Sequence, residues 1–227
     1  LLSANCRMYM AKWDLSKAYM QLHHQRTQTW RQALYWVWYE AGVKHGGWFR
    51  DSVCEWGQRQ LGWAFHRVVT TLIVKFVLQK LMQDWVPHIR CPKLRAWQEG
   101  RAAAGLTDEH GQPGLQCLGA AFFGFLDDFM LFVMSDDQRD IDLAYKIVWD
   151  CFRYLGFNIN ESKHDTEGRP AQVGEALGHG LDFVNLTRFI TEHKKSRVKD
   201  HLHPLRDADL WERFRLEEAV GLLQSLQ

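Results

Sequence analysis

The sequence predicts an α+β fold in which an antiparallel sheet is backed by helices. Residues 122–134 form an apolar, aromatic run about as long as two strands, with Asp127 and Asp128 at its centre, which is typical of a hairpin with buried faces. Residues 65–81 and 144–155 carry apolar side chains at helical spacing, so each buries one face. Helices that follow antiparallel strands favour the α+β class.

Local patterns predict the remaining elements. In chain order we expect a strand, a hairpin, a short strand, a second hairpin and two final helices, at residues 8–13, 34–54, 157–160, 173–184 and 190–227. Gly42, Gly46 and Gly47 predict the turn of the first hairpin, and Pro204 the break between the final helices. A capping-box pattern at residues 135–138 predicts the start of the second long helix.

The stretch between Pro87 and Gly114 loses helical periodicity and accumulates Pro and Gly. We therefore expect residues 86–116 to be a surface insertion, with a helical stretch near residues 93–104. Deleting such an insertion should leave the sheet intact.

Composition narrows the functional classes. The five cysteines are widely spaced without a CxxC pair, which argues against a zinc ribbon or a disulfide framework and favours an intracellular setting, cytoplasm or nucleus. No run of about 18 apolar residues and no signal-peptide layout occurs, so we expect no membrane partner and no secretion. The chain begins without Met and is expected to be a fragment. Its net charge of +1 is low for a protein that binds nucleic acid.

Adjacent carboxylates inside an apolar run require an explanation. Asp127 and Asp128 repel each other, and a divalent cation is an ordinary way to keep both ionised. The alternative is a surface hairpin whose tip is Asp-Asp, because Asp favours turns. Asp14, at the end of the first strand, offers a third carboxylate, although the same position suits a helix N-cap.

Five short motifs occur in a fixed order along the chain. They are Asp14-Leu15 followed by Ala18-Tyr19, Trp56-Gly57 followed by Phe65, Phe125-Leu126-Asp127-Asp128, Leu155-Gly156 followed by Lys163, and Leu177-Gly178-His179-Gly180. Together they resemble the palm domain of reverse transcriptases from retroelements of the LTR or DIRS-like kind. Two features depart from the family. Leu61-Gly62-Trp63 replaces the usual Ser-Pro-Ala of the second motif, and the insertion is longer than in compact members.

The resemblance implies a domain organisation and an activity. Residues 1–190 would form the palm with partial fingers, and residues 191–227 the start of a thumb or connection. The activity would be RNA-directed DNA polymerisation, in which two Mg²⁺ ions (or Mn²⁺ in their place) assist nucleotidyl transfer to a primer 3′-OH. The partners would be an RNA or DNA template-primer, a dNTP and further domains such as complete fingers and RNase H.

The same resemblance implies roles for single residues. Asp14, Asp127 and the Leu15 carbonyl would hold the metal ions, with Asp128 supporting them. The residues expected near the nucleotide are Tyr19, which would exclude a ribose 2′-OH, Lys163, Gly57 and Gln58. Those expected near the primer or duplex are Gly178, His179, Lys194, Lys195 and Arg197. Tyr19 could instead be a core residue, Lys163 a plain surface lysine, and the basic run a solvated helix face.

Two other functions compete with this one. The first is a domesticated or decayed copy that binds nucleic acid without catalysis, against which the retention of all three Asp residues argues. The second is an RNA-directed RNA polymerase, which Tyr19 disfavours because such enzymes usually place a smaller or polar residue there.

Overall fold

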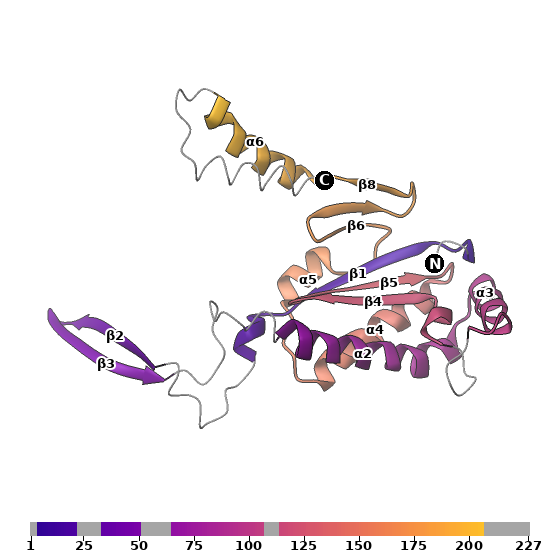
Figure 1. The fold of residues 1–227 in the computed structure, drawn as a ribbon, viewed down its shortest axis with the longest axis horizontal. Coiled ribbons are helices and arrows are strands. Elements are labelled where there is room, and N and C mark those ends of the chain that lie inside the picture. The colour runs from indigo at the N-terminus through magenta and orange to yellow at the C-terminus, as the bar shows by residue number, and fades with distance from the viewer. Residues whose placement is uncertain (1–3, 22–32, 51–64, 107–113, 207–227) are drawn as a thin grey trace.

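A computed structural model describes residues 4–21, 33–50, 65–106 and 114–206, and it confirms the α+β class (Figure 1). A three-stranded antiparallel sheet lies at its centre. In spatial order its strands are β1 (Met8–Asp14), β5 (Asp128–Met134) and β4 (Ala120–Phe125). The first strand and the 122–134 hairpin therefore form where the sequence predicts them.

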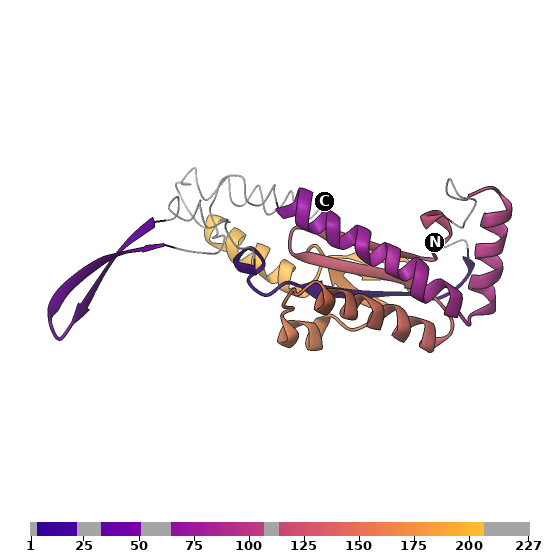
Figure 2. The same cartoon turned by 90° about the horizontal axis from the view of Figure 1, so that it is seen from below.

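Two long helices pack on one face of this sheet (Figure 2). The first is continuous through η4 (Phe65–Thr70), α2 (Thr71–Lys80) and η5 (Leu81–Trp85), and the second is α4 (Gln138–Tyr154). Val77 and Phe152, one from each helix, are fully buried with Trp13 and Phe129 of the sheet. Most of the two apolar stripes predicted from the sequence form the main core, but Val68 and Leu72 of the first helix are exposed. None of the described helices could cross a membrane.

The opposite face of the sheet meets a second, smaller antiparallel sheet. Its strands are β6 (Val173–Ala176), β7 (His179–Asp182) and β8 (Thr187–Phe189), and α6 (Glu192–Arg206) follows them. Met10, Met130 and Ala176 form the buried contact between the two sheets. Strands β1 and β5 are therefore covered on both faces, by helices on one side and by the β6–β7 hairpin on the other (Figure 1).

The first predicted hairpin forms with a different register. It consists of β2 (Ala33–Glu40) and β3 (Val43–Arg50), and it lies apart from the central sheet in both views (Figures 1 and 2). Its turn is Ala41-Gly42, whereas Gly46 and Gly47 lie inside β3. The side chain of Tyr35 fills the space that a Cβ at Gly46 would need, so this glycine permits a close approach within the ladder.

The segment expected to be a surface insertion is integral to the core. It contains η6 (Val86–His88), the expected helix α3 (Pro92–Ala103) and η7 (Leu115–Cys117), together with residues 107–113, which lie outside the described range. Ile89 and Leu94 are fully buried in the main cluster. Their apolar side chains were too widely spaced to show a period, which is why the sequence suggested a peripheral segment.

Asp140, on the first turn of α4, ties this segment to the helix. Its side chain is 1% exposed and accepts hydrogen bonds from the backbone N–H groups of Arg90 (2.8 Å) and Cys91 (3.0 Å) and from the Ser135 hydroxyl (2.8 Å). The predicted capping box does not form. Asp137 caps α4 by accepting a hydrogen bond from the Arg139 N–H, and the Ser135 hydroxyl donates to Asp140 instead.

Two other expectations near the C-terminal half are corrected. Residues 157–160 make only an isolated bridge between Ile159 and Leu15, and an unpredicted short helix, α5 (Glu161–Glu167), follows. Helix α6 runs through Pro204 instead of ending there. Proline fixes a φ that is itself helical, so a helix passes through it near its end at the loss of one hydrogen bond.

Asp140→Ala should lower the free energy of unfolding by about 3 kcal/mol, because it leaves the backbone N–H groups of Arg90 and Cys91 and the buried Ser135 hydroxyl without their acceptor. Asp142→Ala, an exposed position on the same helix, should change it by less than about 0.5 kcal/mol. Urea denaturation of both variants measures this, and equal small effects would show that the buried carboxylate is not a structural requirement.

Candidate active site

The strand register brings the predicted carboxylates together. Asp14, the last residue of β1, pairs directly with Asp128, the first residue of β5. Asp127 precedes Asp128 in the β4–β5 turn, and its carbonyl accepts a hydrogen bond from Leu15 N–H at 3.1 Å. All three Asp residues are partly buried. Two segments far apart in the sequence therefore place three carboxylates at one end of the sheet.

The turn that carries Asp127 has a strained backbone that a helix holds in place. Leu126 has a φ of 55°, a left-handed conformation that is unusual for a bulky residue and costs about 1–3 kcal/mol. The buried Thr70 donates from its hydroxyl to the Leu126 carbonyl at 2.8 Å, and the Leu126 N–H donates to Nδ1 of His66 at 3.4 Å. Thus the helix at residues 65–85 determines where Asp127 lies.

Gly124 allows that helix to come close to the turn. A Cβ at this position would overlap the methyl group of Thr70 and the ring of Phe129. The glycine in the aromatic run before Asp127-Asp128 therefore has a packing role.

The buried His164 positions the lysine that pairs with Asp14. His164 on α5 is 4% exposed, and its Nδ1 donates to the Lys12 carbonyl at 2.8 Å while the Tyr145 hydroxyl donates to its Nε2. Its ring stacks on Trp13 with centroids 5.5 Å apart. These contacts fasten α5 to β1, and Lys163, one residue before His164, reaches Asp14 with its Nζ 3.4 Å from Oδ2.

The three carboxylates carry more negative charge than the lysines beside them offset. Burial and the neighbouring charge of Asp14 raise the pKa of Asp128, while Lys163 and Lys12 partly offset the rise. The oxygens of the three carboxylates do not all lie within 4.8 Å of one another, since the described residues contain such a close group only at Cys6, Cys91 and Asp136. Oxygen donors with an excess of negative charge fit Mg²⁺ or Mn²⁺, which would relieve this repulsion.

A cavity of about 460 Å³ opens beside Asp128. Lys12 of β1 and Lys163 of α5 line one side of it, and the β6–β7 hairpin and the start of α6 line the other. The residues from that second side are Glu175, Ala176, Leu177, Gly178 and His193. The cavity therefore extends from Asp128 to the hairpin to which the resemblance gives a role at the primer.

The other expected primer residues are distributed around this hairpin. Leu177 and Gly178 form its turn with φ of 50° and 76°, and Gly178 lines the cavity. Lys194 Nζ lies 3.6 Å from where a Cβ of Gly178 would stand, so this lysine lies over the turn. His179 instead lines a neighbouring apolar groove.

Lys195 and Arg197 lie further along α6. Lys195 Nζ pairs with Glu192 of the same helix at 2.6 Å, an i,i+3 contact on an exposed face.

The structure describes the side chains of none of three expected nucleotide-site residues, Tyr19, Gly57 and Gln58. The backbone of Tyr19 belongs to a short helical turn, η2 (Ala18–Gln21), but its side chain is outside the described part. Gly57 and Gln58 lie within residues 51–64, which are also outside it.

Sequence reasoning missed Lys12, Glu175 and His193, which line the cavity. A usable pattern existed for Lys12, because residues two apart on a strand share a face and Lys12 is two before Asp14. Glu175 and His193 carry no such local pattern, since the packing of the second sheet and α6 brings them in.

No protein-family model matches the chain, and no curated protein matches it.

Lowering the pH should destabilise the fold through His164. Burial lowers the pKa of His164 below the ordinary 6.5. The unfolded chain therefore binds more protons than the folded chain as the pH falls. The stability that the neutral ring contributes is present above pH 6.5 and is lost as the pH falls through the pKa of the folded state. In urea denaturation, His164→Gln should lose less stability than wild type between about pH 7.5 and 5.5. The exposed His88→Gln variant should behave like wild type, and an unchanged slope in His164→Gln would contradict this account.

Proposed function

We propose that this chain is the palm of an RNA-directed DNA polymerase from a retroelement, a nucleotidyltransferase. The observation that carries the proposal is the pairing of Asp14 with Asp128, with Asp127 in the adjoining turn. An antiparallel hairpin with Asp-Asp at its turn, next to a strand ending in Asp, supplies carboxylates from two segments to one point. If Asp127 and Asp128 were only the tip of a surface hairpin, nothing would require a third carboxylate, Asp14, on the paired strand.

Two divalent cations would be held by Asp14, Asp127 and the backbone carbonyl of Leu15. The neighbouring carboxylate of Asp128 would support them. Bound Mg²⁺ would supply charge neutralisation and activation of a primer hydroxyl. The strained turn and the β1–β5 ladder fix the backbone that carries these oxygens, and bound cations would draw the carboxylate side chains together.

The cavity beside Asp128 would receive the triphosphate together with its cations. Lys12 of β1 and Lys163 of α5 line it, and the carboxylates of Asp128 and Glu175 balance their charge, so an anionic substrate would depend on bound metal ions. Lys163 is bound to Asp14 in the structure, and a triphosphate would compete for its ammonium group. The ammonium group of Lys163 would then place positive charge near the departing pyrophosphate, a role in which a lysine acts as a point charge.

The β6–β7 hairpin would guide the primer. The Gly178 turn lets a backbone approach closely, and Lys194 beside it offers charge to a phosphate. Because this hairpin and Asp128 line the same cavity, a primer end held at the hairpin would lie near Asp128.

One observation favours the second candidate, a module that binds nucleic acid without catalysis. Phe123 and Phe125 are 54% and 53% exposed on the sheet face beside the site, and they line a groove with Leu177, His179 and Arg188. Exposed aromatic rings next to a cation provide stacking platforms for single-stranded bases. Such a groove is sufficient for a module that only binds nucleic acid, whereas polymerisation also needs the carboxylates, so activity must decide between the two.

Primer extension by the full chain on a primed RNA template tests the proposal. Wild type should extend the primer with dNTPs in Mg²⁺, and Asp127→Asn or Asp14→Asn should lower kcat by about a hundredfold or more, because each removes a charge on which the site depends. Asp165→Asn, an exposed carboxylate on α5, is the matched control and should retain activity.

Template binding with no extension by wild type would favour the non-catalytic module. Extension that survives both Asp14→Asn and Asp127→Asn would overturn the assigned site.

A further inference from the structure

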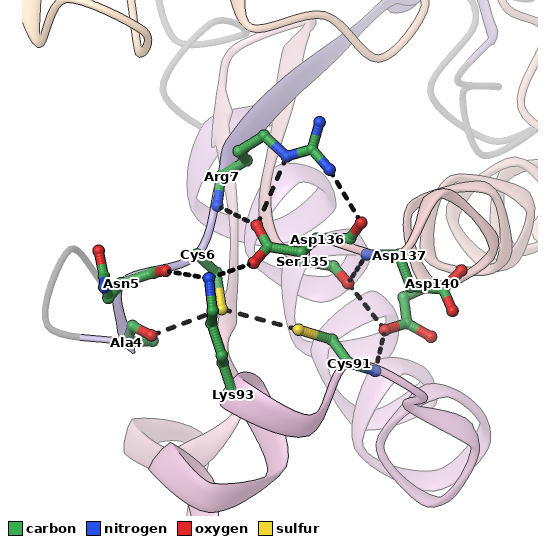
Figure 3. A network of polar contacts seen from close by, with 10 residues as sticks. All are labelled: Ala4, Asn5, Cys6, Arg7, Cys91, Lys93, Ser135, Asp136, Asp137 and Asp140. Atoms are coloured by element: carbon green, nitrogen blue, oxygen red, sulfur yellow. Dashed lines mark hydrogen bonds and ion pairs between the residues drawn. The ribbon is translucent and has the colours of Figure 1, made fainter.

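Two cysteines and an aspartate meet at the opposite end of the central sheet (Figure 3). Cys6 precedes β1, Cys91 precedes α3, and Asp136 lies in the turn between β5 and α4. Each offers one ligand atom, and these atoms all lie within 4.8 Å of one another. The cysteines are 85 positions apart, so no spacing in the sequence could reveal the group.

The distance between the sulfur atoms suits a shared metal ion. Cys6 Sγ and Cys91 Sγ are 3.8 Å apart. A tetrahedral zinc ion with Zn–S bonds of about 2.3 Å sets its two sulfur ligands about 3.8 Å apart. A disulfide would need them at about 2.05 Å, so its formation would require the sulfur atoms to approach each other, whereas a shared zinc ion would leave their separation unchanged.

The charges around the group are also suitable. Two thiolates and a carboxylate carry three negative charges against the two positive charges of zinc. Lys93 and Arg7 supply positive charge, because Lys93 Nζ lies 2.7 Å from Asp136 Oδ2 and Arg7 Nε lies 3.5 Å from Oδ1. The backbone N–H of Arg7 also donates to Oδ1 at 3.0 Å. Lys93 is exposed on a flexible stem, so it can yield Oδ2 to a metal while Arg7 keeps Oδ1 in place.

The surrounding backbone holds the ligands in position before any metal binds. The N–H of Cys91 donates to the buried Asp140 at 3.0 Å, which fixes the residue that precedes α3. The N–H of Ser135, next to Asp136, donates to the Arg7 carbonyl at 3.0 Å. Cys91 is 1% exposed and Cys6 is partly buried, so water competes little for the sulfur atoms.

We propose that Cys6, Cys91 and Asp136 bind one zinc ion, with a water molecule as the fourth ligand. The ion would fasten the start of β1 to the start of α3 and to the β5–α4 turn. Asp14 lies at the other end of β1, roughly 20 Å away at the usual rise per residue of a strand. The site is therefore separate from the proposed polymerase centre, and the two hypotheses can fail independently.

Metal titration of the full, reduced chain tests this site. Wild type should bind one equivalent of Zn²⁺, and Cys6→Ser and Cys91→Ser should each weaken binding by about a hundredfold. Cys117→Ser is the matched control, because Cys117 is buried and its thiol donates to the Leu106 carbonyl away from the group, so it should bind as wild type does.

Co²⁺ gives a second readout. Wild type and Cys117→Ser should show the strong visible absorption of tetrahedral Co²⁺ with its thiolate charge-transfer band, and Cys6→Ser should lose it. Cys6 is only partly buried, so this variant keeps the test valid if Cys91→Ser does not fold. Absence of Zn²⁺ binding by wild type, or equal binding by wild type and Cys6→Ser, would overturn the proposal.

Discussion

The candidate site depends on one antiparallel pairing, that of β1 with β5. It places Asp14 opposite Asp128 and so concentrates negative charge in a partly buried position, which no fold would favour for stability alone. The rest of the structure compensates for this. Trp13 anchors the adjacent strand position in the core, and Lys163 provides the nearest opposite charge. A divalent cation at the proposed site would relieve this repulsion.

The alternation of side chains along β1 and β5 explains how a polar site coexists with a large core. Trp13 and Phe129 face the long helices and are almost fully buried, whereas Lys12, Asp14 and Asp128 face the second sheet. Each carboxylate is thus one residue from a tightly packed aromatic ring. This arrangement makes the positions of the charges a direct consequence of core packing, and it explains why the cavity lies between the two sheets and not within the helical layer.

The sequence predicted the parts of this architecture that have a period or a local composition. The long helices and the Asp127-Asp128 hairpin are of this kind. Helix α5 was missed because seven mostly polar residues carry no apolar stripe, and tertiary contacts of His164 hold it in place. The meeting of Cys6 with Cys91 could not be predicted either, since it depends on how β1 and α3 pack. Long-range contacts of this sort are absent from any local pattern.

The central claim is that Asp14, Asp127 and Asp128 form a cation site, and the ionisation of Asp128 tests it most directly. NMR titration of its side-chain carboxyl carbon, with and without Mg²⁺, follows that ionisation. We expect its pKa to lie above the ordinary 3.8 in metal-free buffer and to fall when Mg²⁺ is added, because a bound cation favours the charged carboxylate. The resonance of exposed Asp165 should not respond to Mg²⁺. An Asp128 titration that is the same with and without Mg²⁺ would contradict the account.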